Sequence, residues 1–110
     1  MKEFFASIYA GLYNNSMKPH FEWDAEKARL NYAKHKISFE EAATVFNDPE
    51  SITQFDPDHS DQEQRFIDIG ASDQGRLLVV VYTERGRNLR IISCRKATRN
   101  ERSIYDQSDG

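Results

Sequence analysis

The side chains best suited to chemistry in this sequence are the cations that gather at and beyond its last apolar stretch. Between positions 83 and 102 there are two acidic residues and seven basic ones, namely Arg85, Arg87, Arg90, Arg95, Lys96, Arg99 and Arg102. Arginine can contact two phosphate oxygens at once and stays charged when it is partly buried. The pattern therefore predicts a surface that binds an anion, for which the RNA or DNA backbone is the commonest candidate. A solvated charged face without a ligand is the alternative.

Charge is also divided unevenly along the whole chain. The 110 residues carry a net charge of −3. Positions 1–63 hold 6 basic and 12 acidic residues, whereas positions 64–110 hold 9 basic and 6 acidic residues. Ion pairing with the acidic N-terminal half is thus an alternative role for each arginine of the C-terminal half.

Other common reaction centres lack the residues that they need. The three histidines, His20, His35 and His59, do not show the spacing of metal ligands, and the chain has one cysteine. The loop "DPDHSD" (56–61) lacks the glycine and the distal glutamate of a calcium site. The glycines are isolated, and no nucleophile elbow supports Ser-His-Asp catalysis. We therefore expect neither a metal ion nor a cofactor.

Length and composition indicate one globular domain. A chain with 38% hydrophobic and 12% aromatic residues has enough apolar area for a modest core. The single Cys94 lies in an apolar stretch, which predicts a buried, unreactive thiol and suits a reducing cytoplasm. No segment is long enough to span a membrane. We expect residues 1–20 to be an appendage or an alternative start, and residues 21–110 to form the domain.

The first half of the domain shows two helix signals. "FEWD" (21–24) alternates apolar and polar residues as a short strand does, and Asp24 is a suitable N-cap for a helix that runs to His35. Within that helix Ala28, Tyr32 and His35 are predicted to form one stripe. Ser38 and Glu41 form a capping box for a second helix, which ends before Pro49.

The second half is dominated by strands. "QRFIDIGAS" (64–72), "RLLVVVYTE" (76–84) and "LRIISCRK" (89–96) are joined by short turns and predict an antiparallel meander. The middle segment has no alternation, which favours a central strand covered on both faces. A further short strand is possible around "SITQF" (51–55), and Thr98 with Glu101 opens a final helix. The expected fold is α+β, a small antiparallel sheet with helices packed on it.

Five blocks of the sequence, taken in order, resemble the BrnT family of bacterial type II toxins. They are "FEWDAEKARLNYAKH", "SFEEAATVFNDP", "QRFIDIG", "GRLLVVVYTERG" and "LRIISCRKATRNER", and the resemblance spans about Phe21 to Tyr105. It implies a compact RelE-like ribonuclease fold and a cytoplasmic toxin that inhibits translation and growth by cleaving RNA. It also implies neutralisation by a BrnA-type antitoxin with a ribbon-helix-helix module, a heterotetrameric assembly, and contact with operator DNA only through that antitoxin. The sequence departs from the family at Lys36, where glycine is usual, which should alter the turn between the helices. Residues 1–16 have no recognised counterpart.

A metal-free ribonuclease must activate the ribose 2′-hydroxyl, stabilise charge on the phosphorane and protonate the leaving 5′-oxygen. His35 is the first candidate for proton transfer, because it is the only histidine inside a predicted element. A histidine that caps the carbonyls at a helix end is the alternative for this residue. The reserve candidates are Lys27, Glu63, Tyr82 and Glu84.

The cations divide into two expected roles. Arg65, which opens the first meander strand, is expected to join Arg90 and Arg95 across the sheet and stabilise the transition state. RNA binding is expected of Arg87, Lys96, Arg99 and Arg102. A non-catalytic module whose basic face binds a nucleic acid or an acidic partner is the alternative function.

Overall fold

The computed structural model describes residues 19–57 and 63–108, so the expected appendage lies outside the described residues except for its last two positions. The strands are β1 His20–Glu22, β2 Ile52–Asp56, β3 Arg65–Ala71, β4 Leu77–Arg85 and β5 Asn88–Lys96. The helices are α2 Ala25–His35, α3 Phe39–Thr44, which continues into a 3-10 turn at Val45–Asn47, and α4 Arg99–Ser108. No helix in these two ranges is both long and apolar enough to cross a membrane.

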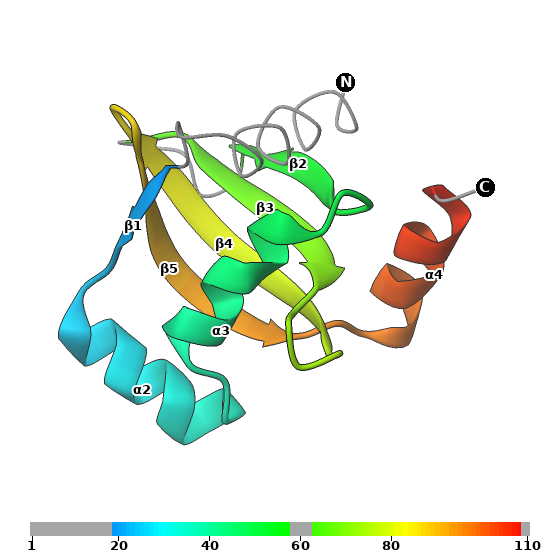
Figure 1. Cartoon of the computed structure of the whole chain (residues 1–110), viewed down its shortest axis with the longest axis horizontal. Coiled ribbons are helices and arrows are strands. Elements are labelled where there is room, and N and C mark those ends of the chain that lie inside the picture. The colour runs from blue at the N-terminus through cyan, green and yellow to red at the C-terminus, as the bar shows by residue number, and fades with distance from the viewer. Residues whose placement is uncertain (1–18, 58–62, 109–110) are drawn as a thin grey trace.

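All five strands form one sheet in the order β1-β5-β4-β3-β2, and Figure 1 shows α3 lying across it. The predicted meander of β3, β4 and β5 is confirmed, with β4 in the centre, and the short strand around 51–55 is present as β2. The expectation of an antiparallel sheet is wrong, because β1 pairs with β5 in parallel, His20 opposite Asn88 and Glu22 opposite Arg90. β1 runs alongside β5 only after the chain has crossed over through two helices and three strands, which is the long connection that a parallel pair needs.

Helices cover both faces of the sheet. On one face Phe39 and Phe46 pack with Leu78, Val80 and Tyr82 in the main core, all at most 1% exposed. On the other face Ile69, Leu77 and Val79 form a smaller cluster, against which Tyr105 of α4 packs. β4 contributes to both cores, and this explains why its apolar run has no alternation.

Local signals in the sequence explain where the helices begin. The Asp24 carboxylate accepts from the Lys27 amide at 2.9 Å. Thr98 and Glu101 form the full reciprocal capping box, at 2.8 and 3.2 Å. Ser38 accepts from the Glu41 amide at 3.0 Å, but the Glu41 carboxylate is used elsewhere, so the predicted reciprocal bond of this box is wrong.

Helix α2 is rotated relative to the stripe that the sequence predicts. Tyr32 is 54% exposed, whereas Asn31 is buried at 8% exposure and faces the sheet. The Asn31 side-chain amide accepts from Cys94 N at 3.0 Å and donates to Cys94 O at 2.9 Å and to Ile37 O at 3.1 Å. β1 pairs with β5 only as far as Arg90, so Asn31 takes the place of a strand partner along the remaining edge of β5. Because a buried polar group needs such bonds, they outweigh the apolar stripe in orienting the helix.

The turn after α2 retains the conformation that a glycine would adopt there. Lys36 has φ 61° and ψ 33°, in the left-handed region, and its amide donates to Tyr32 O at 2.8 Å. This is the usual position of glycine at a helix C-terminus. The expectation that Lys36 alters the turn is therefore wrong: the lysine adopts the glycine-like conformation at some cost in strain.

Candidate active site

An open groove of about 240 Å³ lies between α2 and β5, lined by Lys27, Leu30, Asn31, Lys34, His35, Ile92 and Ser93. Residues three, four, seven and eight positions apart lie on one side of a helix, which is why Lys27, Lys34 and His35 all reach the same groove. The groove exists because β1 leaves the edge of β5 beyond Arg90 unpaired, and α2 approaches that edge through Asn31. The structure thus brings together two predicted site residues, His35 and Lys27.

The basic side chains of the groove have no carboxylate partner among residues 19–57 and 63–108. Within these ranges Lys27, Lys34 and His35 form no ion pair, and the hydrogen bond at the end of α2 is made by the Lys36 amide and not by the His35 ring. The capping role that was the alternative for His35 is therefore not seen in the described part of the chain. Lys34 was missed by the sequence analysis, although its position seven residues after Lys27 on a predicted helix could have revealed it.

The predicted arginines of the sheet lie on one face. Thr83 of β4 is paired with Arg65 of β3 on one side and with Arg90 of β5 on the other. Arg95 of β5 is paired with Val79 of β4 and lies on the same face of the sheet. Ser93 precedes Arg95 by two residues, so this face meets the groove at the edge of β5. The register of the meander therefore places Arg65 and Arg90 near each other and Arg95 near the groove.

Unlike the groove cations, the sheet arginines have carboxylate partners. Arg95 binds Glu101 through two contacts of 2.8 Å each, and Arg90 binds Glu22 at 3.0 Å. Arg65 Nε lies 4.0 Å from Glu63. The ion-pair alternative is thus correct for Arg90 and its N-terminal partner. For Arg95 the pair is present, but its partner lies in the C-terminal half and joins β5 to α4.

The ion pairs of Arg95 and Arg90 lower the pKa of the carboxyl groups that take part in them. The hydrogen bonds from Arg95, stronger in effect than burial, lower the pKa of Glu101 to about 2. The hydrogen bond from the Asn88 side chain and then that from Arg90 lower the pKa of Glu22. Both carboxylates are therefore ionised at neutral pH and compete with any anion for their arginines.

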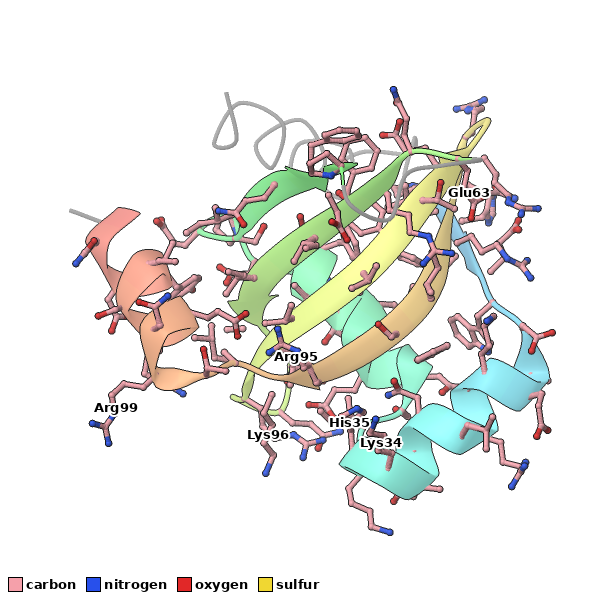
Figure 2. All side chains as sticks on the ribbon, turned by 180° about the vertical axis from the view of Figure 1, so that it is seen from behind. Lys34, His35, Glu63, Arg95, Lys96 and Arg99 are labelled. Carbon is pink, nitrogen blue, oxygen red and sulfur yellow. The ribbon has the colours of Figure 1, made fainter. Side chains whose placement is uncertain are left out.

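Three further candidates lie away from the groove. Tyr82 is fully buried, and its hydroxyl lies 3.5 Å from Asp68 Oδ1, a position that does not support the expected catalytic role. Glu63 and Glu84 line a separate opening with Phe66 and other residues around the start of β3. Figure 2 shows Glu63 at the opposite end of the sheet from Arg95 and Lys96. The structure does not bring these carboxylates to His35.

The expected RNA-binding cations occupy three places. Arg87 is exposed in the turn between β4 and β5, and Arg99 extends outward from the start of α4 (Figure 2). Lys96 and Arg102 line a pocket that also includes Arg76, a residue that the sequence analysis missed. Arg76 stands alone in its segment, and no local pattern marks it.

Two buried groups in the core carry titratable protons. Burial raises the pKa of Asp68 to about 7, against the opposing effect of its hydrogen bonds with Thr53 and Tyr82. Burial also raises the pKa of Cys94 to about 12, and the thiol is 1% exposed, which confirms the predicted unreactive cysteine. Among the described residues no three His, Cys, Asp or Glu side chains gather as a metal ion would require.

A comparison with known families matches residues 23–101 to the family described as the ribonuclease toxin, BrnT, of type II toxin-antitoxin systems. The chain belongs to the BrnT family. The match covers the groove, strands β2 to β5 and the first residues of α4, and it confirms the resemblance seen in the sequence blocks. A toxin of this family has RNA as its substrate and an antitoxin as its partner.

The fold of this BrnT chain is also found in a crystal structure of the Brucella abortus ribonuclease toxin, BrnT. The two share 22% sequence identity with a TM-score of 0.55, and the alignment covers 74% of this chain and all of the Brucella chain. At that identity the likeness concerns the fold alone. No curated protein matches the sequence.

Proposed function

We propose that this BrnT chain is an endoribonuclease that cleaves RNA through the ribose 2′-hydroxyl, without a metal ion, at the groove between α2 and β5. The observation that carries the proposal is the presence in one groove of a histidine and two lysines without carboxylate partners among the described residues. Histidine changes its protonation near neutral pH, and ammonium groups close to a phosphorane stabilise the charge that grows on it.

The proposed reaction assigns one role to each group. His35 takes the proton of the 2′-hydroxyl as that oxygen attacks phosphorus. Lys27 and Lys34 stabilise the extra charge on the non-bridging oxygens. The bond from phosphorus to the 5′-oxygen breaks, and that oxygen takes a proton from solvent water as it leaves. The products are a 2′,3′-cyclic phosphate and a 5′-hydroxyl.

The test uses the purified protein and a short RNA in the presence of a chelator. Cleavage that yields a 2′,3′-cyclic phosphate is the expected result. A matched RNA whose riboses are all 2′-O-methylated should remain intact, because it has no nucleophile. Loss of cleavage on adding the chelator would contradict the metal-independent mechanism. Binding without any cleavage would instead favour the non-catalytic module.

We further propose that a BrnA-type antitoxin with a ribbon-helix-helix module neutralises the toxin in the cytoplasm, within a heterotetramer that contacts operator DNA only through the antitoxin. The exposed cations around the groove support this, because an inhibitor that excludes RNA must satisfy the same charges. Association should then slow steeply as salt is added, while dissociation changes little. Stopped-flow measurement of both rates tests the proposal, and a salt-independent association rate would contradict it. A relation to RelE-like ribonucleases remains a prediction.

A further inference from the structure

A second cationic site lies beside the groove, at the opposite end of α2 from its N-cap. Here a pocket of about 290 Å³ is lined by Gly75, Arg76, Leu77, Lys96, Ala97 and Arg102. These residues come from three parts of the chain, namely the turn before β4, the end of β5 and the first turns of α4. The register explains their meeting, because Leu78 stands opposite Lys96, and Ala97 N donates to Leu77 O at 3.0 Å.

The Arg76 side chain is held in place by Glu41 and by the carbonyl of Lys36. Its Nε donates to Glu41 Oε2 at 2.9 Å, and its Nη2 contacts Glu41 Oε1 and donates to Lys36 O at 3.3 Å. The Glu41 side chain is 2% exposed and also accepts from the Ser72 hydroxyl at 2.6 Å. No bond of Arg76 Nη1 occurs within the described ranges. The guanidinium is therefore fixed in position and retains N–H donors for a ligand.

The other two cations of the pocket supply its net charge. The hydrogen bond from Arg76 lowers the pKa of Glu41, so both groups of this pair are charged and the pair is neutral as a whole. Neither the Lys96 nor the Arg102 side chain takes part in an ion pair within residues 19–57 and 63–108. Two exposed positive charges thus accompany one fixed guanidinium, an arrangement suited to a group with several anionic oxygens.

The pocket and the groove are joined through the backbone. Arg76 donates to the carbonyl of Lys36, the residue that follows His35. Lys96 follows Ser93 of the groove by three residues along β5. Figure 2 shows Lys96 at the same end of the molecule as Lys34 and His35. The pocket therefore adjoins the end of the groove through the carbonyl of Lys36.

From these observations we infer that the pocket of Arg76, Lys96 and Arg102 is a second phosphate-binding site, which holds a phosphodiester of the RNA strand adjacent to the one cleaved in the groove. The inference rests on the proposed function. Such a site positions the strand without reading its sequence, because it contacts only the backbone. Its loss should weaken binding and leave the chemical step intact.

The test measures binding of a single-stranded 2′-O-methyl RNA, which cannot be cleaved through its riboses, as salt is varied. For the double variant Lys96→Ala/Arg102→Ala we expect the Kd to rise about 25-fold, on the basis of roughly fivefold for each exposed contact. The slope of the logarithm of affinity against the logarithm of salt should shrink by about 1.4, since two phosphate contacts are lost. With cleavable RNA the same variant should raise KM and leave kcat near the wild-type value.

The matched control is Arg29→Ala. Arg29 is also an exposed helix arginine, but it pairs with Glu26 on the outer part of α2 and does not line the pocket. Arg29→Ala should bind RNA like the wild type, whereas Arg102→Ala alone should bind RNA more weakly. Circular dichroism melting of each variant checks the fold, which these exposed side chains should not affect.

Three results would overturn the inference. An unchanged Kd and salt slope in the double variant, beside a wild type that cleaves RNA, would remove the second site and leave the proposed function standing. Variants that bind RNA normally but associate slowly with the antitoxin would assign the pocket to a protein partner. A wild type that neither binds nor cleaves RNA would overturn the second site and the proposed function together.

Discussion

Two cationic regions of the molecule differ in what their charges do. On the sheet face against which α4 packs, Arg90 and Arg95 are each bound to a carboxylate and hold β1 and α4 against β5. In the groove, Lys27, Lys34 and His35 have no such partner in the described part of the chain. A carboxylate partner competes with a phosphate for a paired cation, whereas an unpaired cation gives up only water. The difference indicates that the density of arginines along the chain marks structural pairs as much as a binding surface.

The largest expected effect separates the groove from every other part of the molecule. His35→Gln should lower the rate of RNA cleavage by about 100-fold or more, the usual contribution of a general acid or base. Its melting temperature should stay close to that of the wild type, because the ring makes no hydrogen bond within the described ranges. His20→Gln, at an exposed position of β1, is the matched control and should remain active. A His35 variant that loses stability and activity in parallel would place the base elsewhere.

The pH dependence of the free energy of unfolding tests a buried carboxyl group of the sheet. Asp68, a buried residue of β3, has its pKa raised by burial to about 7 from an ordinary 3.8, with Asp48 adding to the rise. Between about pH 4 and pH 7 the unfolded chain therefore releases a proton that the folded protein keeps, so the free energy of unfolding falls as pH rises. The loss from this group should be about 2–4 kcal/mol and should be complete above pH 7.

Asp68→Asn should remove this slope. Urea unfolding of both proteins at several pH values gives the difference directly, and other titrating groups cancel in it. Equal slopes in the two proteins would mean that Asp68 is ionised in the fold.

Lys34→Ala tests the groove through binding. We expect RNA affinity to fall about fivefold with no change in the midpoint of thermal unfolding, since the loss of an exposed charged contact is modest. The measurement is the Kd for 2′-O-methyl RNA beside a melting curve. A lower unfolding midpoint with an unchanged Kd for RNA would show that Lys34 has a structural role, as the paired arginines of the sheet do.

For Arg95→Ala the expected effect is on stability. Removing the Glu101 pair should lower the free energy of unfolding by about 1 kcal/mol after allowance for solvent, because the Arg95 side chain is 43% exposed. Glu101→Gln keeps the capping bond to Thr98 and removes only the charge, so it is the matched partner in a double-mutant cycle. A cycle without coupling energy, together with a large loss of cleavage in Arg95→Ala, would move this arginine from the structural group to the catalytic one.

The smallest expected effect is a gain in stability from a substitution at Lys36, next to the groove. Lys36 occupies the left-handed region at φ 61°, where glycine has no steric penalty. Lys36→Gly should therefore raise the free energy of unfolding by about 0.5 kcal/mol, after the greater chain entropy of glycine is subtracted. Chemical denaturation checks it, with Lys34→Gly inside α2 as the control, which should be destabilising. A loss of stability in Lys36→Gly would show that the side chain contributes packing at this turn.

The sequence by itself determined the elements that depend on neighbouring residues. Asp24 and Thr98 begin helices because their side chains bond amides within one turn, and the meander follows from apolar runs joined by short turns. The order of the residue blocks likewise indicated the BrnT family, which the match over residues 23–101 confirms. His35 and Lys27 were named as site candidates from their places on a predicted helix, and the structure places both in one groove.

Only the tertiary structure decided what depends on residues far apart in the chain. The parallel pairing of β1 with β5 joins positions more than sixty residues apart, and no local pattern encodes it. Asn31 and Arg76 owe their roles to partners on other elements, Cys94 for the first and Glu41 for the second. Which cations are paired and which are available was equally a matter of tertiary contact, because an ion pair forms only where the fold brings a carboxylate within about 4 Å of the cation.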